Sequence, residues 1–173
     1  KILAVFKNGT FYTTSFDLSN RYQGDVLRIE KFDPEKTFTA LYYDAKAKAF
    51  YVKRFSFILS DNNPVSFIAE GQKSYLVDIC DDKYPQFLVT FAGKNAKEPE
   101  AVDAEALIGK KGIAAKGRKC VDRGEVKEVH FIEPLIKDEP IELEMPQEID
   151  IEDITEVTEF SDIPEIIDEP TLF

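Results

Sequence analysis

The sequence is poor in the residues that build metal and redox centres. It has no tryptophan, a single histidine, His130, and two cysteines, Cys80 and Cys120. One histidine and two distant cysteines cannot supply the ligand sets that usually hold zinc, so we expect no metal site. Neither cysteine belongs to a Cys-x-x-Cys pair, which argues against a disulfide framework and favours a reducing, cytoplasmic compartment. We interpret His130, within the alternating run Val129–Ile132, as a satisfied strand residue.

Motifs that mark common enzymes are also missing. The sequence has no Gly-x-x-x-x-Gly-Lys-Ser/Thr loop, since Gly109–Gly112 lacks that spacing, and no Gly-x-Ser-x-Gly turn. We therefore predict no catalytic residue and no cofactor in this chain. A hydrolase stays open only if acidic pairs converge in the fold. Apolar runs such as Ile2–Phe6 and Phe87–Ala92 are far shorter than the roughly 20 residues that cross a bilayer, so we expect no membrane association.

The C-terminal residues Asp138–Phe173 contain no Lys, Arg or His. They hold 14 of the 33 Asp and Glu residues, which leaves 22 basic and 19 acidic residues, about +3, in Lys1–Lys137. We therefore predict a mildly basic body, residues 1–137, and an acidic, Pro- and Ile-rich tail, residues 138–173. Such a tail can compete with phosphates for a basic surface or can act as a solvated extension. Because the chain begins without methionine or a secretory signal, we interpret it as part of a longer protein.

Short runs rich in Phe, Tyr, Val and Ile, separated by turn residues, predict that the body is all-β. Asn8-Gly9 is the strongest hairpin signal, because a type I′ turn needs two residues that tolerate positive φ. Lys94–Ala106 lacks alternation and predicts a long loop or a short helix around Ala101–Leu107. The predicted strands are Ile2–Phe6, Thr10–Phe16, Val26–Phe32, Thr37–Tyr43, Phe50–Phe57, Tyr75–Ile79, Phe87–Phe91, Gly112–Lys116 and Val126–Ile132.

A period near fifty residues organises these strands. Asp25–Asp44 aligns with Ser74–Gly93 without a gap, which places Leu27 over Leu76 at a spacing of 49 residues. The first strand of this unit recurs at Glu125–Glu133. Repeats of this size with about four short strands each are typical of propeller-like folds, in which each blade packs on its neighbours. We predict a propeller-like fragment of two to three four-stranded blades.

The densest cluster of positive charge is Gly109–Lys119, which interleaves five cations with glycines. Glycine lets the backbone approach a phosphate closely, and several cations together drive sequence-independent DNA binding through counterion release. A flexible, solvated hairpin loop would have the same composition, so both interpretations stay open. The candidate cations of this segment are Lys110, Lys111, Lys116, Arg118 and Lys119.

A second candidate lies in the predicted strand Phe50–Phe57. Alternation sends Lys53 and Arg54 to opposite faces of this strand, so the two cannot both be buried. One of them, with Arg28 or Lys31 from the neighbouring strand, extends a basic stripe along a rim in one interpretation and forms a structural ion pair in the other.

Four segments, in this order, resemble the C-terminal domain of bacterial topoisomerase IV A, within the gyrase A and topoisomerase IV A family. They are Phe6–Phe11, Thr39–Asp44, Phe50–Phe55 and Ile108–Lys119. The similarity covers Lys1 to about Pro134 and is strongest in the Tyr-x-Lys-Arg-Phe and Lys- and Gly-rich segments. The sequence lacks the Gln-Arg-Arg-Gly-Gly-Lys-Gly type box of gyrase, which favours topoisomerase IV.

The resemblance implies a β-pinwheel, a propeller-like array whose blades exchange strands and whose basic rim binds and bends duplex DNA. It implies that this chain guides DNA, while the cleaving tyrosine and an ATPase that uses ATP and Mg lie in other parts of the enzyme. The second type of chain in that enzyme, topoisomerase IV B, would be the partner in the intact bacterial protein. The rim residues carried over from the two matching segments are Lys53, Arg54, Lys110, Lys111, Lys116, Arg118 and Lys119.

A rival interpretation is a propeller-like protein-interaction module whose acidic tail binds a partner. The distribution of charge separates the two. A continuous basic rim across blades would favour DNA, whereas lysines paired to carboxylates would favour the interaction module.

Overall fold

The computed structural model describes residues 1–69, 71, 73–94 and 96–138 of the chain. Chain contacts separate Lys1–Asp138 from Glu139–Phe173, so the predictions made for the tail beyond Asp138 lie outside the described residues. The described part holds eleven β-strands and one four-residue α-helix. It is therefore all-β, as the sequence predicts.

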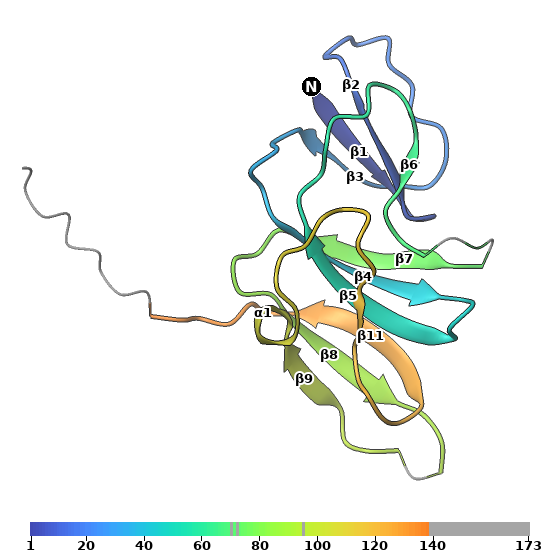
Figure 1. The fold of residues 1–173 in the computed structure, drawn as a ribbon, viewed down its shortest axis with the longest axis vertical. Coiled ribbons are helices and arrows are strands. Elements are labelled where there is room, and N and C mark those ends of the chain that lie inside the picture. Colours follow the sequence, from blue (N-terminus) through green and yellow to red (C-terminus); the bar gives the residue numbers. More distant parts are fainter. Residues whose placement is uncertain (70, 72, 95, 139–173) are drawn as a thin grey trace, which may run out of the picture. The chain divides into compact units, whose positions relative to one another are not determined.

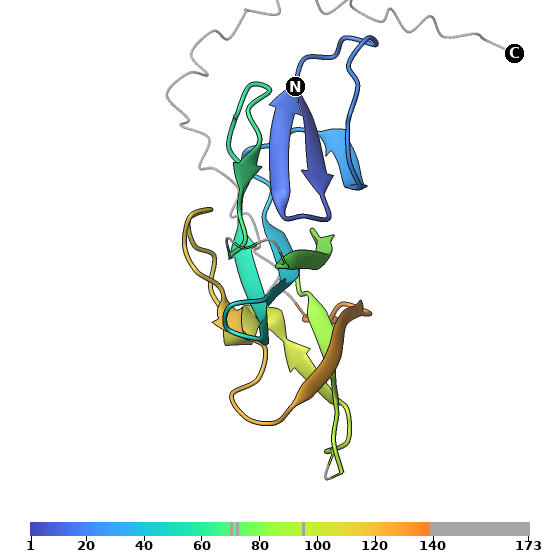
Figure 2. The ribbon, with the colours of Figure 1, turned by 90° about the vertical axis from the view of Figure 1, so that its right-hand side faces the viewer.

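The strands form three antiparallel sheets, which follow one another in chain order (Figures 1 and 2). Sheet A has the strand order β3-β1-β2-β6, sheet B has β10-β5-β4-β7, and sheet C has β11-β8-β9. Two of the three therefore have the predicted four strands. The strand bounds are β1 Ile2–Phe6, β2 Thr10–Thr14, β3 Val26–Lys31, β4 Phe38–Asp44, β5 Ala49–Phe55, β6 Val65–Ser66, β7 Tyr75–Cys80, β8 Gln86–Phe91, β9 Glu100–Asp103, β10 Arg118–Lys119 and β11 Val126–Ile132.

The sheets exchange strands. Each is built around a hairpin of consecutive strands, β1–β2, β4–β5 or β8–β9, and a third strand pairs with the first strand of that hairpin. The fourth strand arrives only after the chain has formed the hairpin of the next sheet. In this way β6 returns to pair with β2, and β10 returns to pair with β5. Within the described part of the chain no strand pairs with the outer edge of β9, so sheet C has three strands.

The repeat seen in the sequence is structural. Strands β3, β7 and β11 occupy the same position in sheets A, B and C, next to the first hairpin strand. Phe38 and Phe87, 49 residues apart, lie at the start of β4 and β8 and are 1% and 0% exposed. The spacing therefore matches the advance from one blade to the next.

The Asn8-Gly9 turn closes the first hairpin and also receives an exchanged segment. Gly9 has a φ of +78°, and the Asn8 side chain accepts hydrogen bonds from Thr10 N (3.1 Å) and Oγ1 (2.7 Å). Phe67 N donates to Gly9 O at 3.0 Å, and a Cβ on Gly9 would lie 2.1 Å from Ile68 Cδ1. Only glycine accommodates both the backbone angle and this approach.

A core made mainly of phenylalanine joins sheets A and B. The Phe57 ring lies at its centre and packs on Phe11, Phe38, Phe55 and Phe67, with ring centroids 4.7 to 5.3 Å apart. All five rings are at most 2% exposed. Without tryptophan, phenylalanine supplies the large apolar areas that this small core needs.

A second core lies between sheets B and C. Leu41 and Val52 of sheet B pack with Phe87 and Val89 of sheet C, and all four are fully buried. Because the alternate side chains of β4 and β5 serve both cores, sheet B has two apolar faces. This explains the nearly continuous burial of its two central strands.

Three local predictions need correction. Gly112–Lys116 is a loop, and the strand follows it as β10. The segment around Ala101–Leu107 forms β9 and then the short helix α1, Ala104–Leu107, whose N-terminal amides are capped by the Asp103 carboxylate. The two-residue strand β6 was not predicted, since so short a strand has no alternation to detect.

Candidate functional site

The five clustered cations are all exposed. Gly109–Lys119, which we call the basic loop, runs from the end of α1 to β10, along the β5 side of sheet B (Figure 2). In the described part of the chain none of these cations forms an ion pair. Arg118 Nη1 donates to Leu107 O at 3.1 Å, and Lys116 Nζ lies 5.1 Å from the centroid of the Tyr51 ring. Their positive charge therefore faces solvent without a neutralising carboxylate.

The basic loop is held by specific contacts with sheet B. Lys111 N donates to Arg54 O at 2.8 Å, and Gly117 N donates to Tyr42 Oη at 3.1 Å. A tight turn joins Ala115 N to Gly112 O at 3.0 Å. These contacts favour an ordered loop over the flexible alternative that the composition left open.

Gly117 lets the basic loop approach sheet B closely. A Cβ at this position would lie 2.6 Å from Val52 O and 2.9 Å from Tyr42 Oη, closer than a methyl group can pack. The neighbouring Gly109 and Gly112 meet nothing within 4 Å. One glycine of the segment is thus required by close packing against the sheet, while the other two leave backbone accessible.

A hollow of about 340 Å³ lies on the outer side of the basic loop. Lys111, Lys116 and Arg118 line it, together with the backbone of Gly109 and Gly117. Several cations around exposed glycine backbone form a surface suited to a phosphate group, because both side chains and amides can donate to it.

Lys53 and Arg54 do not lie on an exposed rim, contrary to the sequence-based expectation. They are 4% and 9% exposed. Lys53 Nζ donates to Phe67 O at 2.6 Å and to Ile113 O, and burial lowers the pKa of its ammonium to about 8. Arg54 Nε is buried with no hydrogen-bond partner among the described residues. Sheet B has neighbours on both faces, so alternation exposes neither side chain.

Arg28 belongs to a charge-balanced network. It contacts Glu30 and Asp81 at 2.6 Å each, and Lys36 contacts the same two carboxylates at 2.9 and 2.5 Å. Both cations lie 5.3 Å from the centroid of the Phe38 ring. Because Asp81 follows β7 and Arg28 is on β3, the network ties sheet B to sheet A. For Arg28 the structural ion pair is the alternative observed.

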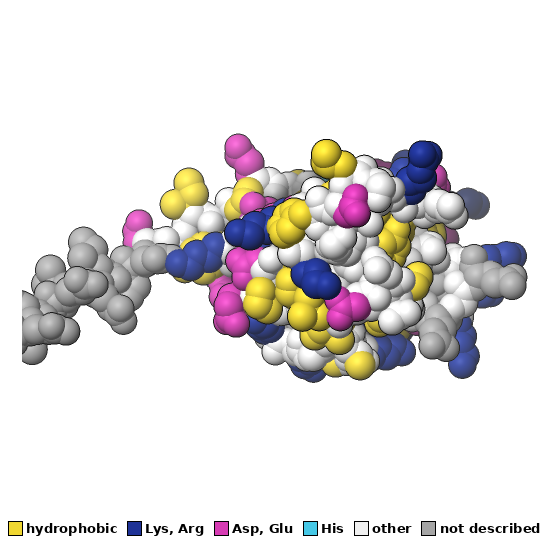
Figure 3. Space-filling model, turned by 90° about the horizontal axis from the view of Figure 1, so that it is seen from above, with side chains coloured by type: hydrophobic (Ala, Val, Ile, Leu, Met, Phe, Trp, Pro, Cys, Tyr) yellow, Lys and Arg dark blue, Asp and Glu magenta, His cyan; other side chains and the backbone are white. Residues whose placement is uncertain are grey.

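Lys31, the other additional rim candidate, is exposed on β3. On the face viewed in Figure 3, Lys and Arg side chains are interspersed with Asp, Glu and hydrophobic side chains. The unpaired cations that adjoin one another are therefore those of the basic loop, at one edge of sheet B. The positive surface is local.

Sequence reasoning missed the residues that position the basic loop. Tyr42 reads as a core aromatic, and its ring is 1% exposed, yet its hydroxyl reaches Gly117. Burial and the Asp44 charge raise the pKa of this hydroxyl despite the opposing hydrogen bond from Gly117 N. The signal available in the sequence was the proximity of Tyr42 to Lys53 across one hairpin.

The described residues offer no cluster of three or more His, Cys, Asp or Glu side chains that could hold a metal ion. The helix search over the same residues finds none long and apolar enough to cross a membrane.

Strand-exchanged four-stranded sheets and an ordered, exposed basic loop define an all-β domain of repeated blades. Residues 1–133 match the family of topoisomerase C-terminal domains of Bacteroidota, and the chain belongs to this family. No curated protein matches the chain, and no solved structure does. The match ends at the close of sheet C and leaves the acidic tail outside it.

Proposed function

We propose that this chain is a non-catalytic DNA-binding and DNA-bending domain of a type IIA topoisomerase, specifically of topoisomerase IV A. It guides duplex DNA for strand passage, and topoisomerase IV B is its partner in the intact enzyme, in the bacterial cytoplasm. The observation that carries the proposal is the basic loop, in which five exposed cations are held on a fixed backbone.

The chemistry suits a backbone contact with no base readout. Lysines and arginines around glycine amides neutralise phosphates without distinguishing bases. If all five cations replace counterions, log K falls against log salt concentration with a slope of about −4.5. This is a weak, salt-sensitive contact, in keeping with a body that carries only about +3. In the intact enzyme such a contact steers DNA that other domains grip.

The acidic tail has a modulating role in this proposal. Its fourteen carboxylates and lack of cations make it a competitor for any surface that phosphates occupy. Removing Asp138–Phe173 is expected to tighten duplex binding at low salt and to have less effect at high salt, where the Debye length shortens. Equal affinity with and without the tail at low salt would refute this role.

The second candidate function is a protein-interaction module. The observation in its favour is the pairing of Arg28 and Lys36 with Glu30 and Asp81, which leaves sheet A without a basic rim. In that case the basic loop is a solvated connection and DNA affinity is absent.

The deciding experiment measures binding of a labelled duplex of about 40 base pairs over a salt series. One variant replaces the five cations of the basic loop by glutamine. A matched control replaces five exposed cations elsewhere: Lys7, Arg21, Lys73, Lys94 and Lys127. We expect the basic-loop variant to lose most of its affinity and salt slope and the control to lose less than half of its slope.

End-to-end energy transfer on the same duplex reports bending. Binding that is abolished in the basic-loop variant supports the DNA-guiding role. No binding by the unmodified chain at low salt would turn the assignment to the interaction module.

A further inference from the structure

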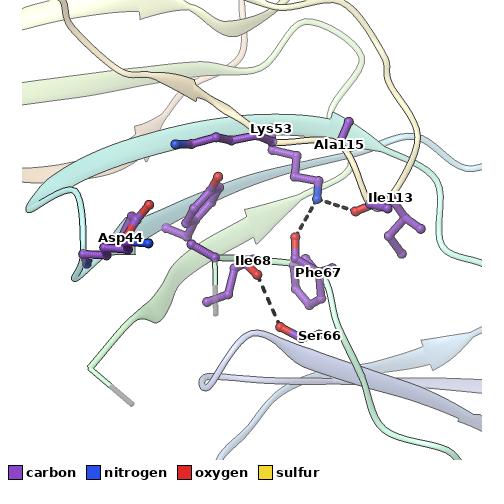
Figure 4. Close-up of a pocket in the computed structure, with 12 residues that line it drawn as sticks. Asp44, Lys53, Ser66, Phe67, Ile68, Ile113 and Ala115 are labelled. Carbon is purple, nitrogen blue, oxygen red and sulfur yellow. Dashed lines mark hydrogen bonds between the residues drawn. The ribbon is translucent and has the colours of Figure 1, made fainter. Parts of the chain in front are cut away.

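One ammonium group connects the basic loop to the strand exchanged into sheet A. Lys53 Nζ points between Phe67 O and Ile113 O and donates to both (Figure 4). Phe67 directly follows β6, which belongs to sheet A, while Ile113 lies in the basic loop that precedes β10 of sheet B. The two exchanged segments of the described chain therefore meet at a single side chain.

The position of Lys53 has an energetic cost that packing alone does not justify. Its side chain is buried, and in the described part of the chain no carboxylate forms an ion pair with it. Burying an unpaired ammonium is expensive unless its protons are hydrogen-bonded. A methionine would fill a similar volume without this cost. What the ammonium adds is directional, since it fixes two backbone carbonyls relative to each other.

The same cavity joins this contact to an exposed cation. It has a volume of about 490 Å³, and Tyr42, Lys53, Phe67, Ile113 and Lys116 are among its lining residues. Lys116 follows Ile113 by three residues, across the turn in which Ala115 N donates to Gly112 O. Fixing Ile113 O at one end and Gly117 N on Tyr42 Oη at the other therefore fixes the backbone that presents Lys116.

We infer that Lys53 is a positioning residue for the DNA contact: it touches no phosphate and holds the basic loop in its binding conformation by linking it to the exchanged strand of sheet A. This inference rests on the proposed function. It replaces the direct phosphate contact expected from the sequence. It also makes the geometry of the basic loop dependent on the packing of a neighbouring blade.

The test compares Lys53→Met with Lys116→Gln in the full chain at neutral pH, using the 40-base-pair duplex and a salt series. Lys116→Gln removes an exposed charge, so we expect weaker binding and a salt slope smaller by about 0.9. Lys53→Met leaves all five exposed charges in place. We expect it to weaken binding roughly tenfold, because the loosened basic loop must be ordered on binding, with the slope unchanged.

Amide hydrogen exchange supplies a readout that does not need DNA. In Lys53→Met we expect faster exchange at the hydrogen-bonded amides of Ala115 and Gly117, while amides of β8 in sheet C keep their protection. Ile68→Ala, which loosens the segment after β6 without touching the basic loop, should accelerate the same two amides. Combined with Lys53→Met, it should add little further effect, since both changes break one link.

The outcomes are separable. A salt slope reduced by about 0.9 in Lys53→Met would identify Lys53 as a phosphate ligand and overturn the inference. Unchanged exchange at Ala115 and Gly117 would overturn it as well. If neither Lys116→Gln nor the five-cation variant alters DNA binding, the proposed function fails, and the exchange measurements still decide whether Lys53 positions the basic loop.

Discussion

Replacing Gly117 by alanine should destabilise the protein although it adds only one methyl group. The added Cβ would lie 2.6 Å from Val52 O, 2.9 Å from Tyr42 Oη and 3.1 Å from Tyr42 Cε1. Two of these atoms belong to a side chain that is 1% exposed, and the third is strand backbone, so none can move aside cheaply. Relief requires the basic loop to withdraw, which breaks the hydrogen bond from Gly117 N to Tyr42 Oη. Overpacking costs about 1 to 3 kcal/mol and a lost hydrogen bond about 1 kcal/mol.

We therefore expect Gly117→Ala to lower the free energy of unfolding by about 2 to 3 kcal/mol, measured by urea denaturation with far-ultraviolet circular dichroism. Gly112→Ala is the matched control, because its Cβ would meet nothing within 4 Å in the same loop. A surface change of this kind should stay within about 0.5 kcal/mol of the unmodified protein. Equal stability of the two variants would refute the argument that the basic loop is packed on sheet B.

Three further predictions concern the core and the charged groups, each measured by urea denaturation. Phe57→Ala removes the ring at the centre of the first core and should cost about 3 to 5 kcal/mol, and a loss below about 1 kcal/mol would contradict that role. Burial acts to raise the pKa of Asp81, but hydrogen bonds from Lys36 and Arg28 hold it below 3.8. The folded protein thus keeps this carboxylate ionised at lower pH than the unfolded chain does. The resulting stabilisation is present above about pH 4 and lost below it, and Asp81→Asn should flatten the acid limb of the stability curve. For Lys53 the sign is opposite: burial lowers its pKa from 10.5 to about 8, so the unfolded chain binds the proton that the folded protein has released between these values. Stability should rise by up to about 3 kcal/mol from pH 8 to 10.5 relative to Lys53→Met, and parallel curves would contradict the shift.

Most of the fold could be predicted from the sequence because its signals are local. The Asn8-Gly9 turn fixes one hairpin, and the bounds of β1 and β11 agree with the predicted strands residue for residue. The 49-residue repeat also carries the blade order, since equivalent strands need equivalent apolar residues. The exchanged strands β6 and β10 could not be found in this way. They have two residues each, and their position depends on pairing with strands more than fifty residues away.

The candidate site was predictable in its charge and not in its geometry. Exposed cations cluster in Gly109–Lys119, as composition indicated, because lysine and arginine next to glycine have no apolar surface to bury. For Lys53 and Arg54 the alternation argument assumed one solvated face. Sheet B is covered on both faces, so the same alternation buries both. That covering is a property of neighbouring blades and leaves no mark within the strand itself.

Strand exchange gives the basic loop its dependence on the rest of the domain. In a sheet built from consecutive strands, a loop at one edge is held only by its own blade. Here the loop follows the hairpin of sheet C, β10 after it pairs with β5 of sheet B, and Lys53 ties it to the segment that completes sheet A. A perturbation in any of the three sheets therefore reaches the five exposed cations through backbone contacts. If a duplex bends along this surface, the force it exerts on the basic loop is shared by all three sheets, and the loop holds its position under load.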